Sequence, residues 1–381
     1  MTTGLPIMTP FPFVDIHGTP RERGRQYGAA AADRTRKSVE VYARQLRDLG
    51  YDWAQIRGFV GDFLPKMDAF APELIEEMRG IAEGAELDFE AVALINCRTE
   101  VMQLAHRRKG MAEDDPDGCT GAVIMGSASA DGQLIHGQNW DWRAECAETA
   151  IVLRVRREDG PDVLTFTEAG GLARNGLNSV GTAITANYLE SDRDYKLEVG
   201  VPLPLIRRKA LEQEHFALSM RIVATTAKSA SNNMILSNAG GFAIDFECAP
   251  DETFPLYPED GLLVHANHWR SPVALTKLKE AGIPSSPESY YRDWRVQQHL
   301  QAKRGQLTAE DMKAAFFDDF GTPYAVCRPP RPSSRANLSA TVAMVIMRPA
   351  EGVMEVAPLP ALNRTFTTYS LDLSRRTKNA A

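Results

Sequence analysis

The pattern of the chain changes at Asp117-Gly118-Cys119-Thr120-Gly121, from helical before it to extended after it. Before this stretch, apolar side chains recur at the three- and four-residue spacings of amphipathic helices, and after it they form the apolar runs of strands. The stretch continues as two such runs joined by Asp131-Gly132, and the second run ends in Asn139-Trp140-Asp141. An Asp-Gly pair in this position predicts a β-hairpin, which brings Asp141 back towards Cys119.

The Gly118–Cys119 junction has the composition that self-cleavage through a thiol requires. Gly118 has no Cβ, so the neighbouring thiol can approach this peptide closely. The thiol would attack the Gly118 carbonyl, the acyl group would move from nitrogen to sulfur, and water would release it. Cys119 would then begin a new chain, and its α-amine, with an ordinary pKa of ~7.7–8.0, can act as general base for its own thiol. The alternative is that Cys119 is a small buried hydrophobic residue.

The Asp-Gly-Cys-Thr sequence at 117–120 and the Asn139-Trp140-Asp141 that follows resemble the acyl-coenzyme A:6-aminopenicillanic acid acyltransferase (isopenicillin N acyltransferase) family. Its members are autoprocessed N-terminal-nucleophile cysteine hydrolases, and the resemblance extends from about Gly18 to about Pro358. The order of expected helices and strands alone indicates the α+β class. The resemblance implies more, namely a four-layer αββα sandwich, the N-terminal-nucleophile hydrolase fold. It also implies a mostly helical α chain, residues 1–118, which stays bound to a β chain, residues 119–381, in one structural domain.

The resemblance implies four catalytic residues. Cys119 is the nucleophile, first against Gly118 and then against substrate, and Asp141 would accept a hydrogen bond from the α-ammonium group of the mature Cys119 or orient it. Asn267 matches the family's catalytic asparagine and would polarise the scissile carbonyl. Arg328 matches a late catalytic arginine and would favour the thiolate. The rivals of Arg328 for this last role are Arg331, Arg335 and Arg348.

Two further features each allow a functional and a structural interpretation. Trp140, Trp142 and Tyr188 can line an apolar acyl pocket, although aromatic side chains more often belong to the core. The segment Asn96–Glu100 resembles a family motif, but we favour a buried polar group that packs its helix on the sheet.

Two other chemistries are weaker interpretations. His265 and His268 lack a carboxylate or cysteine close in sequence, and their spacing on a strand should point them to opposite faces, so we expect no metal. A papain-like pair of Cys119 with His136 or His268 would leave the Gly118–Cys119 junction unexplained.

The remaining periodicities predict the elements around the hairpin. Expected helices cover 21–49, 53–63, 72–84, 88–104 with Asp88 as its cap, 202–214, 216–228, 286–303 and 308–318. Expected strands cover 13–16, 151–156, 163–167, 176–178, 181–187, two within 234–247, 261–268, 340–347 and 353–356.

The composition is that of an ordinary globular protein, with 381 residues and a formal net charge of -7. The mildly acidic balance disfavours nucleic acid and anionic membranes as partners. Five scattered cysteines without CxxC spacing indicate neither a disulfide framework nor a zinc ribbon. The N-terminus lacks the pattern of a signal peptide, and no apolar run approaches the ~20 residues of a membrane helix, so we expect a cytoplasmic protein.

These observations together predict an autoproteolytically activated cysteine amidohydrolase or acyltransferase that acts on a small N-acyl amide through a thioester. We favour hydrolysis and expect no cofactor, because water is always present and the sequence has no Gly-rich phosphate cradle for coenzyme A. The first alternative is an acyl-CoA-dependent N-acyltransferase that uses an amine such as a β-lactam nucleus. The second is a non-catalytic ligand-binding module.

Overall fold

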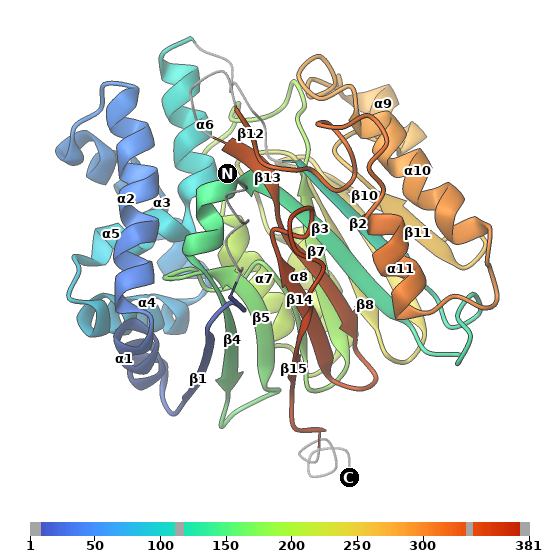
Figure 1. Cartoon of the computed structure of the whole chain (residues 1–381). Helices are drawn as coiled ribbons and strands as arrows, with labels where there is room; N and C mark the ends of the chain where they lie inside the picture. Colours follow the sequence, from blue (N-terminus) through green and yellow to red (C-terminus); the bar gives the residue numbers. More distant parts are fainter. Residues whose placement is uncertain (1–8, 111–117, 333–337, 374–381) are drawn as a thin grey trace, which may run out of the picture.

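The computed structural model describes residues 9–110, 118–332 and 338–373 (Figure 1). Six helices lie beside the sheets on the N-terminal side of the hairpin. They are α1 (Pro20–Ala30), α2 (Ala32–Asp48), α3 (Trp53–Phe70), α4 (Pro72–Ala85), α5 (Phe89–Asn96) and α6 (Arg98–Arg108). Within the described ranges, no helix has both the length and the apolar character that crossing a bilayer demands.

The single helices expected over 21–49 and 88–104 are each two helices, broken at Ala31 and Cys97. The first break separates helices with different main partners, because α1 packs mainly on α4 whereas α2 packs most on α5 and less on α4. A Cβ at Gly24 or Gly28 of α1 would overlap with backbone oxygens of α4, so this contact needs glycine. Asp88 occupies the N-cap position of α5 as predicted, but its side chain pairs with Arg57 and makes no capping hydrogen bond.

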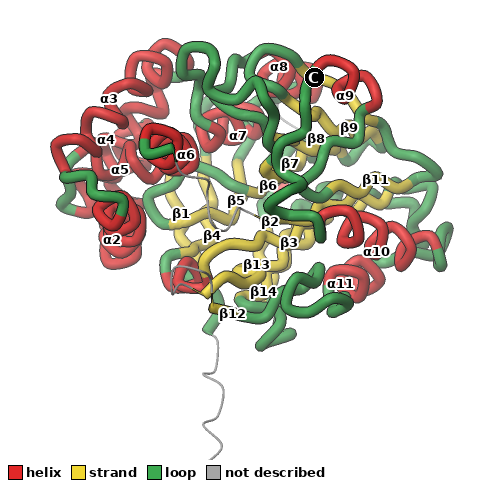
Figure 2. Tube along the Cα trace, turned by 90° about the horizontal axis from the view of Figure 1, so that it is seen from above, coloured by secondary structure: helices red, strands yellow, loops and turns green. Residues whose placement is uncertain are grey.

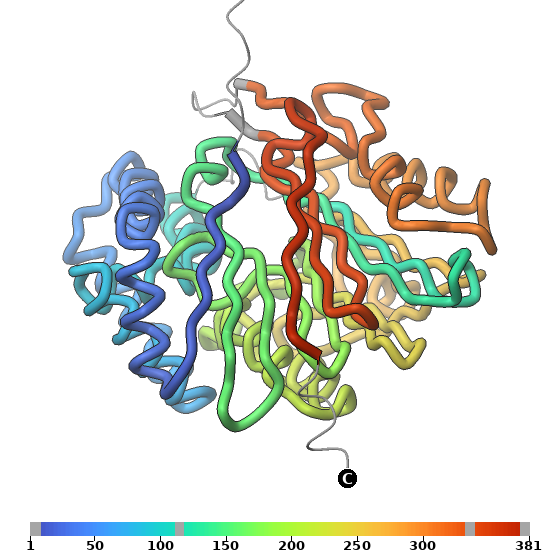
Figure 3. The backbone as a smooth tube through the Cα atoms, turned by 60° about the horizontal axis from the view of Figure 1, so that its bottom comes forward, coloured from blue at the N-terminus to red at the C-terminus, as the bar shows by residue number. Residues whose placement is uncertain are grey.

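The first sheet has eight strands in the order β1-β4-β5-β6-β7-β8-β9-β10. They are β1 (Phe13–His17), β4 (Ala150–Arg156), β5 (Val163–Glu168), β6 (Asn175–Asn178), β7 (Thr182–Tyr188), β8 (Asn232–Asn238), β9 (Phe242–Cys248) and β10 (Thr253–Leu256). Strand β1 runs parallel to β4, and Figure 3 shows the two side by side although they are far apart in sequence. The N-terminal segment is therefore part of the sheet framework.

The second sheet contains the hairpin, in the order β11-β2-β3-β13-β14-β15. Its strands are β11 (Leu262–His265), β2 (Gly118–Ile124), β3 (Ile135–Arg143), β13 (Leu338–Arg348), β14 (Val353–Pro358) and β15 (Thr367–Ser370), and β12 (Arg331–Pro332) pairs with β13. The predicted strands are present. Five short elements were missed, namely β10, β12, β15, the helix α9 (Pro272–Lys277) and the 3₁₀ helix at Ala144–Glu148.

Helices cover the outer faces of both sheets, while the inner faces pack on each other where β2 meets β7. On the first sheet lie α7 (Leu203–Leu211) and α8 (Phe216–Thr225), and on the second lie α10 (Ser289–Gln301) and α11 (Ala309–Phe316). Figure 2 shows these layers edge on. The four-layer αββα sandwich is confirmed, and its inner packing brings the start of β2 close to the end of β7.

The polar segment at 96–100 does hold its helices on the first sheet. Asn96 donates its side-chain nitrogen to Gly170 O at 2.8 Å and accepts from Leu172 N at 2.9 Å. Arg98 donates from Nε to Glu168 Oε2 at 2.9 Å. Each of these buried polar groups thus has a partner, as burial requires, and the packing interpretation of this segment is confirmed.

Candidate active site

The β2–β3 hairpin places Gly118 and Cys119 at the first two positions of β2. The antiparallel register pairs Gly118 with Asp141 and Cys119 with Trp140. The predicted return of Asp141 towards the cysteine is therefore confirmed, although Asp117 lies outside the described residues. Cys119 is buried, with 1% of its surface exposed.

Asp141 and Arg328 pack directly against the backbone of Gly118. A Cβ at this glycine would lie 3.0 Å from Arg328 Nη1 and 3.1 Å from Asp141 Cβ, so a larger residue would have to displace them. Arg328 Nε lies 3.1 Å from Asp141 Oδ2, and Thr341 donates its hydroxyl to Asp141 Oδ1 at 2.6 Å. The structure thus brings together two of the residues that the family resemblance implied.

Asn267 reaches the same point from the opposite side of Cys119. Strand β11 pairs with β2, with His265 opposite Gly121, and Asn267 follows two residues after the strand ends. Its side-chain oxygen accepts a hydrogen bond from Cys119 N at 2.8 Å, and its side-chain nitrogen donates to Tyr188 O at 2.9 Å. Asp141, Arg328 and Asn267 therefore all lie beside the peptide that Gly118 forms with Cys119, the fourth predicted catalytic residue.

Sequence reasoning missed Arg292, which lies on α10 and is fully buried. Its Nη1 donates to Cys119 O at 2.6 Å and to Thr120 Oγ1 at 2.9 Å, and its Nη2 donates to Asn267 Oδ1 at 2.8 Å. One signal was present in the sequence, because Arg292 precedes Val296 and Leu300 at spacings of four on the buried stripe of the helix. A charged residue on such a stripe needs a buried partner.

Glu288, also missed, completes an alternating row of charges at the site. It accepts from Arg328 Nη2 at 2.7 Å and lies 3.9 Å from Arg292 Nη2. Burial raises the pKa of Asp141, against the opposing effect of Arg328 and Arg292. Burial together with Arg328 lowers the pKa of Arg292 to about 10, so this guanidinium stays protonated at neutral pH. Two guanidinium groups and two carboxylates therefore balance one another beside the backbone of Gly118 and Cys119.

The rival arginines have other surroundings. Arg348 pairs with Glu351 and Glu355, and the guanidinium of Arg331 lies 4.5 Å from the centre of the Tyr324 ring. Arg335 lies outside the described residues. Among the four candidates, Arg328 is the one whose described contacts reach Gly118.

The histidines offered for a papain-like pair are engaged elsewhere. The two ring nitrogens of His136 lie 2.9 Å from Ser237 Oγ and 2.8 Å from Thr185 Oγ1, between the sheets. His268 Nδ1 lies 2.8 Å from Ser289 Oγ. These contacts disfavour a general base made from either imidazole.

The expectation that His265 and His268 point to opposite faces was wrong. Their rings stack with centroids 6.1 Å apart, because β11 ends at His265 and the two-residue alternation does not continue to His268. Carboxylates distant in sequence also reach them, with Glu247 at 2.8 Å from His265 and Asp293 at 3.6 Å from His268. Even so, no group of three or more His, Cys, Asp or Glu side chains in the described part of the chain is arranged to hold a metal ion.

The three aromatic residues suggested for a substrate pocket have different environments. Trp140 is fully buried, with the guanidinium of Arg174 4.0 Å from its ring centre, and Trp142 is 7% exposed. These two rings are core residues in this structure. Tyr188 is half-buried and adjoins the site, because its carbonyl accepts from Asn267.

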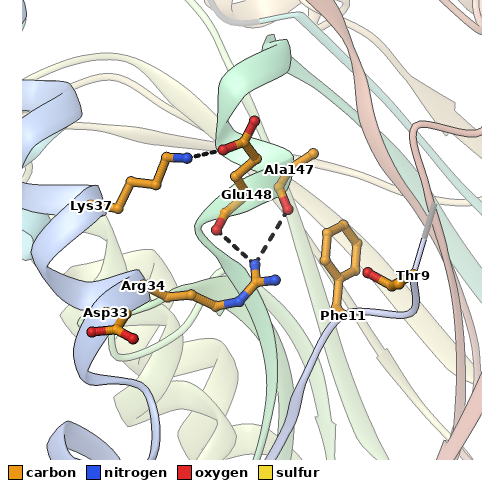
Figure 4. A pocket seen from close by; sticks show the side chains of 7 residues that line it. All are labelled: Thr9, Phe11, Asp33, Arg34, Lys37, Ala147 and Glu148. Atoms are coloured by element: carbon orange, nitrogen blue, oxygen red, sulfur yellow. Dashed lines mark hydrogen bonds and ion pairs between the residues drawn. The ribbon is translucent and has the colours of Figure 1, made fainter. Parts of the chain in front are cut away.

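A cavity of about 380 Å³ lies between α2, the segment before β1 and the short 3₁₀ helix at Ala144–Glu148. Figure 4 shows its lining, which contains none of the predicted site residues. Arg34 donates to Glu148 O at 2.7 Å, and Lys37 pairs with the Glu148 carboxylate. These charged groups already have partners, so the cavity offers no substitute for the site at Cys119.

Two facing sheets covered by helices, with a Gly-Cys junction at the start of an inner strand, define the class of N-terminal-nucleophile hydrolases. The model of the family described as acyl-coenzyme A:6-aminopenicillanic acid acyl-transferase matches residues 128–357. The chain belongs to this family, and it is an enzyme of the acyltransferase and amide hydrolase class. The matched region contains Asp141, Asn267 and Arg328 and begins after Cys119.

Individual proteins resemble the chain over 66–83% of its length. The acyl-coenzyme A:6-aminopenicillanic-acid-acyltransferase 40 kDa form of Emericella nidulans is 26% identical over 320 residues, which cover 83% of this chain and 84% of that protein. A mutant of the conjugated bile acid hydrolase from Clostridium perfringens is 11% identical, with a TM-score of 0.48 over 66% of this chain and 92% of its own. Penicillin V acylase from Agrobacterium tumefaciens is 14% identical, with a TM-score of 0.43 over 67% and 89%.

Proposed function

We propose that the chain cleaves itself between Gly118 and Cys119 and then acts as an N-terminal cysteine amidohydrolase on a small N-acyl amide. The observation that carries this proposal is the enclosure of one peptide bond by complementary groups. Arg328 and Asp141 pack against Gly118, and Asn267 accepts from the nitrogen that would become the α-amine. A purely structural cysteine needs none of these neighbours.

In the proposed self-cleavage, the Cys119 sulfur forms a bond to the Gly118 carbonyl carbon as the C–N bond between the two residues breaks. The thiol proton ends on the released nitrogen. Water then hydrolyses the thioester to a Gly118 carboxylate and the free thiol. The guanidinium of Arg328 beside Gly118 supports this step, because a fixed cation stabilises negative charge on the attacked carbonyl oxygen.

In the proposed turnover, the thiol of the mature Cys119 attacks the acyl carbon of the substrate and releases its amine, leaving a thioester. The α-amine takes the thiol proton and passes it to the leaving amine, and the Asn267 amide group donates to the developing oxyanion. Asp141 orients the site through Arg328, with which it pairs at 3.1 Å. Water completes the cycle by hydrolysing the thioester.

The two proposed chains, 1–118 and 119–381, would stay together after cleavage. The ladder between β1 and β4 joins residues 13–17 to residues 152–156 across the proposed cut. Tyr27 also donates its hydroxyl to Gly171 O at 3.0 Å and accepts from Gly170 N at 2.9 Å. Such buried contacts are typical of a single cooperative domain.

Mass spectrometry of the purified protein tests the cleavage. By residue fraction (118/381 and 263/381 of 42.0 kDa), the pieces should be roughly 13 and 29 kDa. N-terminal sequencing of the larger piece should read Cys-Thr-Gly-Ala-Val, and any other start rejects this junction. A folded, active sample that remains one chain contradicts the N-terminal-nucleophile mechanism.

The second candidate function is transfer of the acyl group from coenzyme A to an amine, which the name of the Emericella nidulans relative favours. Release of 4-nitroaniline from phenylacetyl-4-nitroanilide measures hydrolysis. Loss of the thioester of phenylacetyl-CoA, with and without 6-aminopenicillanic acid, measures transfer. Faster thioester consumption with the amine present, and formation of its amide, would select the transferase.

A further inference from the structure

We infer that Arg292 is a positioning residue that sets which way the Asn267 side-chain amide faces, an inference that rests on the function proposed above. A primary amide has an accepting oxygen at one end and a donating nitrogen at the other, nearly equal in size. Only one of its two orientations presents the nitrogen to a substrate oxyanion. The neighbours of the amide must therefore select that orientation.

In the uncleaved chain, hydrogen-bond donors hold the oxygen end of the amide. Asn267 Oδ1 accepts from Cys119 N at 2.8 Å and from Arg292 Nη2 at 2.8 Å. A peptide N–H and a guanidinium group have no acceptor, so the oxygen must face both of them. The nitrogen of the amide then lies on the other side, where it donates to Tyr188 O.

Cleavage would remove one of these two constraints. The peptide nitrogen of Cys119 can only donate, whereas the neutral α-amine of the mature chain carries a lone pair and can also accept. An amine of this kind tolerates either end of the amide. Arg292 does not change on cleavage and stays a pure donor, so it continues to hold Oδ1, while Tyr188 O accepts from the nitrogen at the other end of the amide.

The geometry also explains why the residue is arginine. The same guanidinium group donates through Nη1 to Cys119 O and Thr120 Oγ1 while Nη2 holds Asn267. A planar fork can make these contacts at once in fixed directions, whereas a lysine ammonium is a single point on a flexible stem. Arg292 thus ties the nucleophile's own carbonyl to the amide.

A double-mutant cycle tests this role. The variants are Arg292→Lys, Asn267→Ala and the double variant, and kcat and KM are measured on phenylacetyl-4-nitroanilide after cleavage is confirmed. We expect Arg292→Lys to lower kcat on the order of 10²-fold, as misplacement of a catalytic group does, with little change in KM. In the Asn267→Ala background, Arg292→Lys should lower kcat by no more than about twofold, because the amide that Arg292 positions is gone. For variants that remain one chain, the rate constant of self-cleavage replaces kcat in the same cycle.

Arg208→Lys is the matched control. Arg208 is also fully buried, and it donates to Glu77 and Glu212 at 2.9 Å among the helices. We expect this variant to lose thermal stability but to keep its kcat. Arg292→Gln, which keeps N–H donors without the charge, provides a second variant if the lysine does not fold, and it should show the same dependence on Asn267.

The outcomes separate this inference from the proposed function. If Arg292→Lys lowers kcat in the Asn267→Ala background as much as it does in the wild type, Arg292 acts on Cys119 directly and the inference is overturned. Wild-type kcat for Arg292→Lys would overturn it as well. If Cys119→Ala, measured in parallel, still cleaves itself or turns over substrate, the proposed function itself fails.

Discussion

The side-chain oxygen of Asn267 accepts a hydrogen bond from the backbone nitrogen of Cys119 at 2.8 Å. The two residues are 148 positions apart and meet because β11 pairs with β2. The atom that would become the α-amine is therefore already held in the uncleaved chain. Such preorganisation lowers the reorganisation needed at the moment of reaction.

Replacing Cys119 by alanine should leave a folded precursor that is neither cleaved nor active, because the proposed nucleophile is absent. All five cysteines are buried, so burial does not distinguish them. Cys97→Ala, Cys146→Ala, Cys248→Ala and Cys327→Ala should each still cleave, apart from any packing loss. Intact-mass measurement decides, and loss of cleavage in one of these four, with cleavage retained in Cys119→Ala, would identify a different nucleophile.

Gly118→Ala should slow or abolish self-cleavage, because the new methyl group would press on Arg328 and Asp141 at 3.0–3.1 Å. Gly58→Ala is its control, since a Cβ at that exposed helical position meets no atom within 4 Å. Alanine there should stabilise the protein by roughly 0.5–1 kcal/mol. Cleavage time courses and thermal melts of both variants check the prediction, and unimpaired cleavage of Gly118→Ala would contradict the packing argument.

Asn267→Ala should lower kcat by ~10²–10³, or ~2.7–4 kcal/mol, through loss of a donor to the oxyanion. Its pH dependence should change little, because no titrating group is removed. The variant must first be confirmed as cleaved, since Asn267 also contacts Cys119 N. A kcat close to wild type in the cleaved variant would remove Asn267 from the site.

Asp141→Asn should change the pH profile as well as the rate. Burial raises the pKa of Asp141, so protonation of this carboxyl at acid pH should produce the acidic limb of kcat/KM in the wild type. That limb should shift or disappear in the variant. Asp318→Asn is the control, because the Asp318 carboxylate pairs with Arg295 and His299. An unchanged acidic limb in Asp141→Asn would show that another group titrates there.

The stability of the protein should fall as the pH rises from 6.5 to about 9. Burial alone would lower the pKa of His265, but Asp245 and Glu247 raise it to about 9, against the effect of Arg270. The folded state therefore binds more protons than the unfolded state in this window, and the free energy of unfolding decreases with pH. Burial lowers the pKa of His268 to about 3. The stability that neutral His268 contributes is therefore lost as the pH falls below 6.5, and not as it rises.

Denaturant titrations at pH 6.5 and about 9 check this prediction. His265→Gln should reduce the decrease in stability between these pH values, whereas His268→Gln should retain it. The same decrease in both variants would mean that His265 is not charged in the folded protein.

The helix breaks and the pair of histidines show where local patterns stop being informative. The apolar spacing of residues 21–49 continues through Ala31, yet α1 and α2 separate there, and each has a different main partner among the neighbouring helices. The alternation rule failed for His268 because β11 ends at His265. In the first case contacts with other helices decided where the helix ended, and in the second the two-residue alternation applied only as far as the strand extends.

The sequence by itself determined the β2–β3 hairpin and the return of Asp141 towards Cys119, because turn chemistry and two-residue alternation act between neighbouring residues, and the structure added the pairing of Asp141 with Gly118. The family resemblance added Asn267 and Arg328, which the structure brings to the same peptide. Only the tertiary structure decided that Arg292 and Glu288 complete the charged surroundings of Cys119. Their partners come from distant segments of the chain. Burial of a charge becomes favourable only when such partners meet in space.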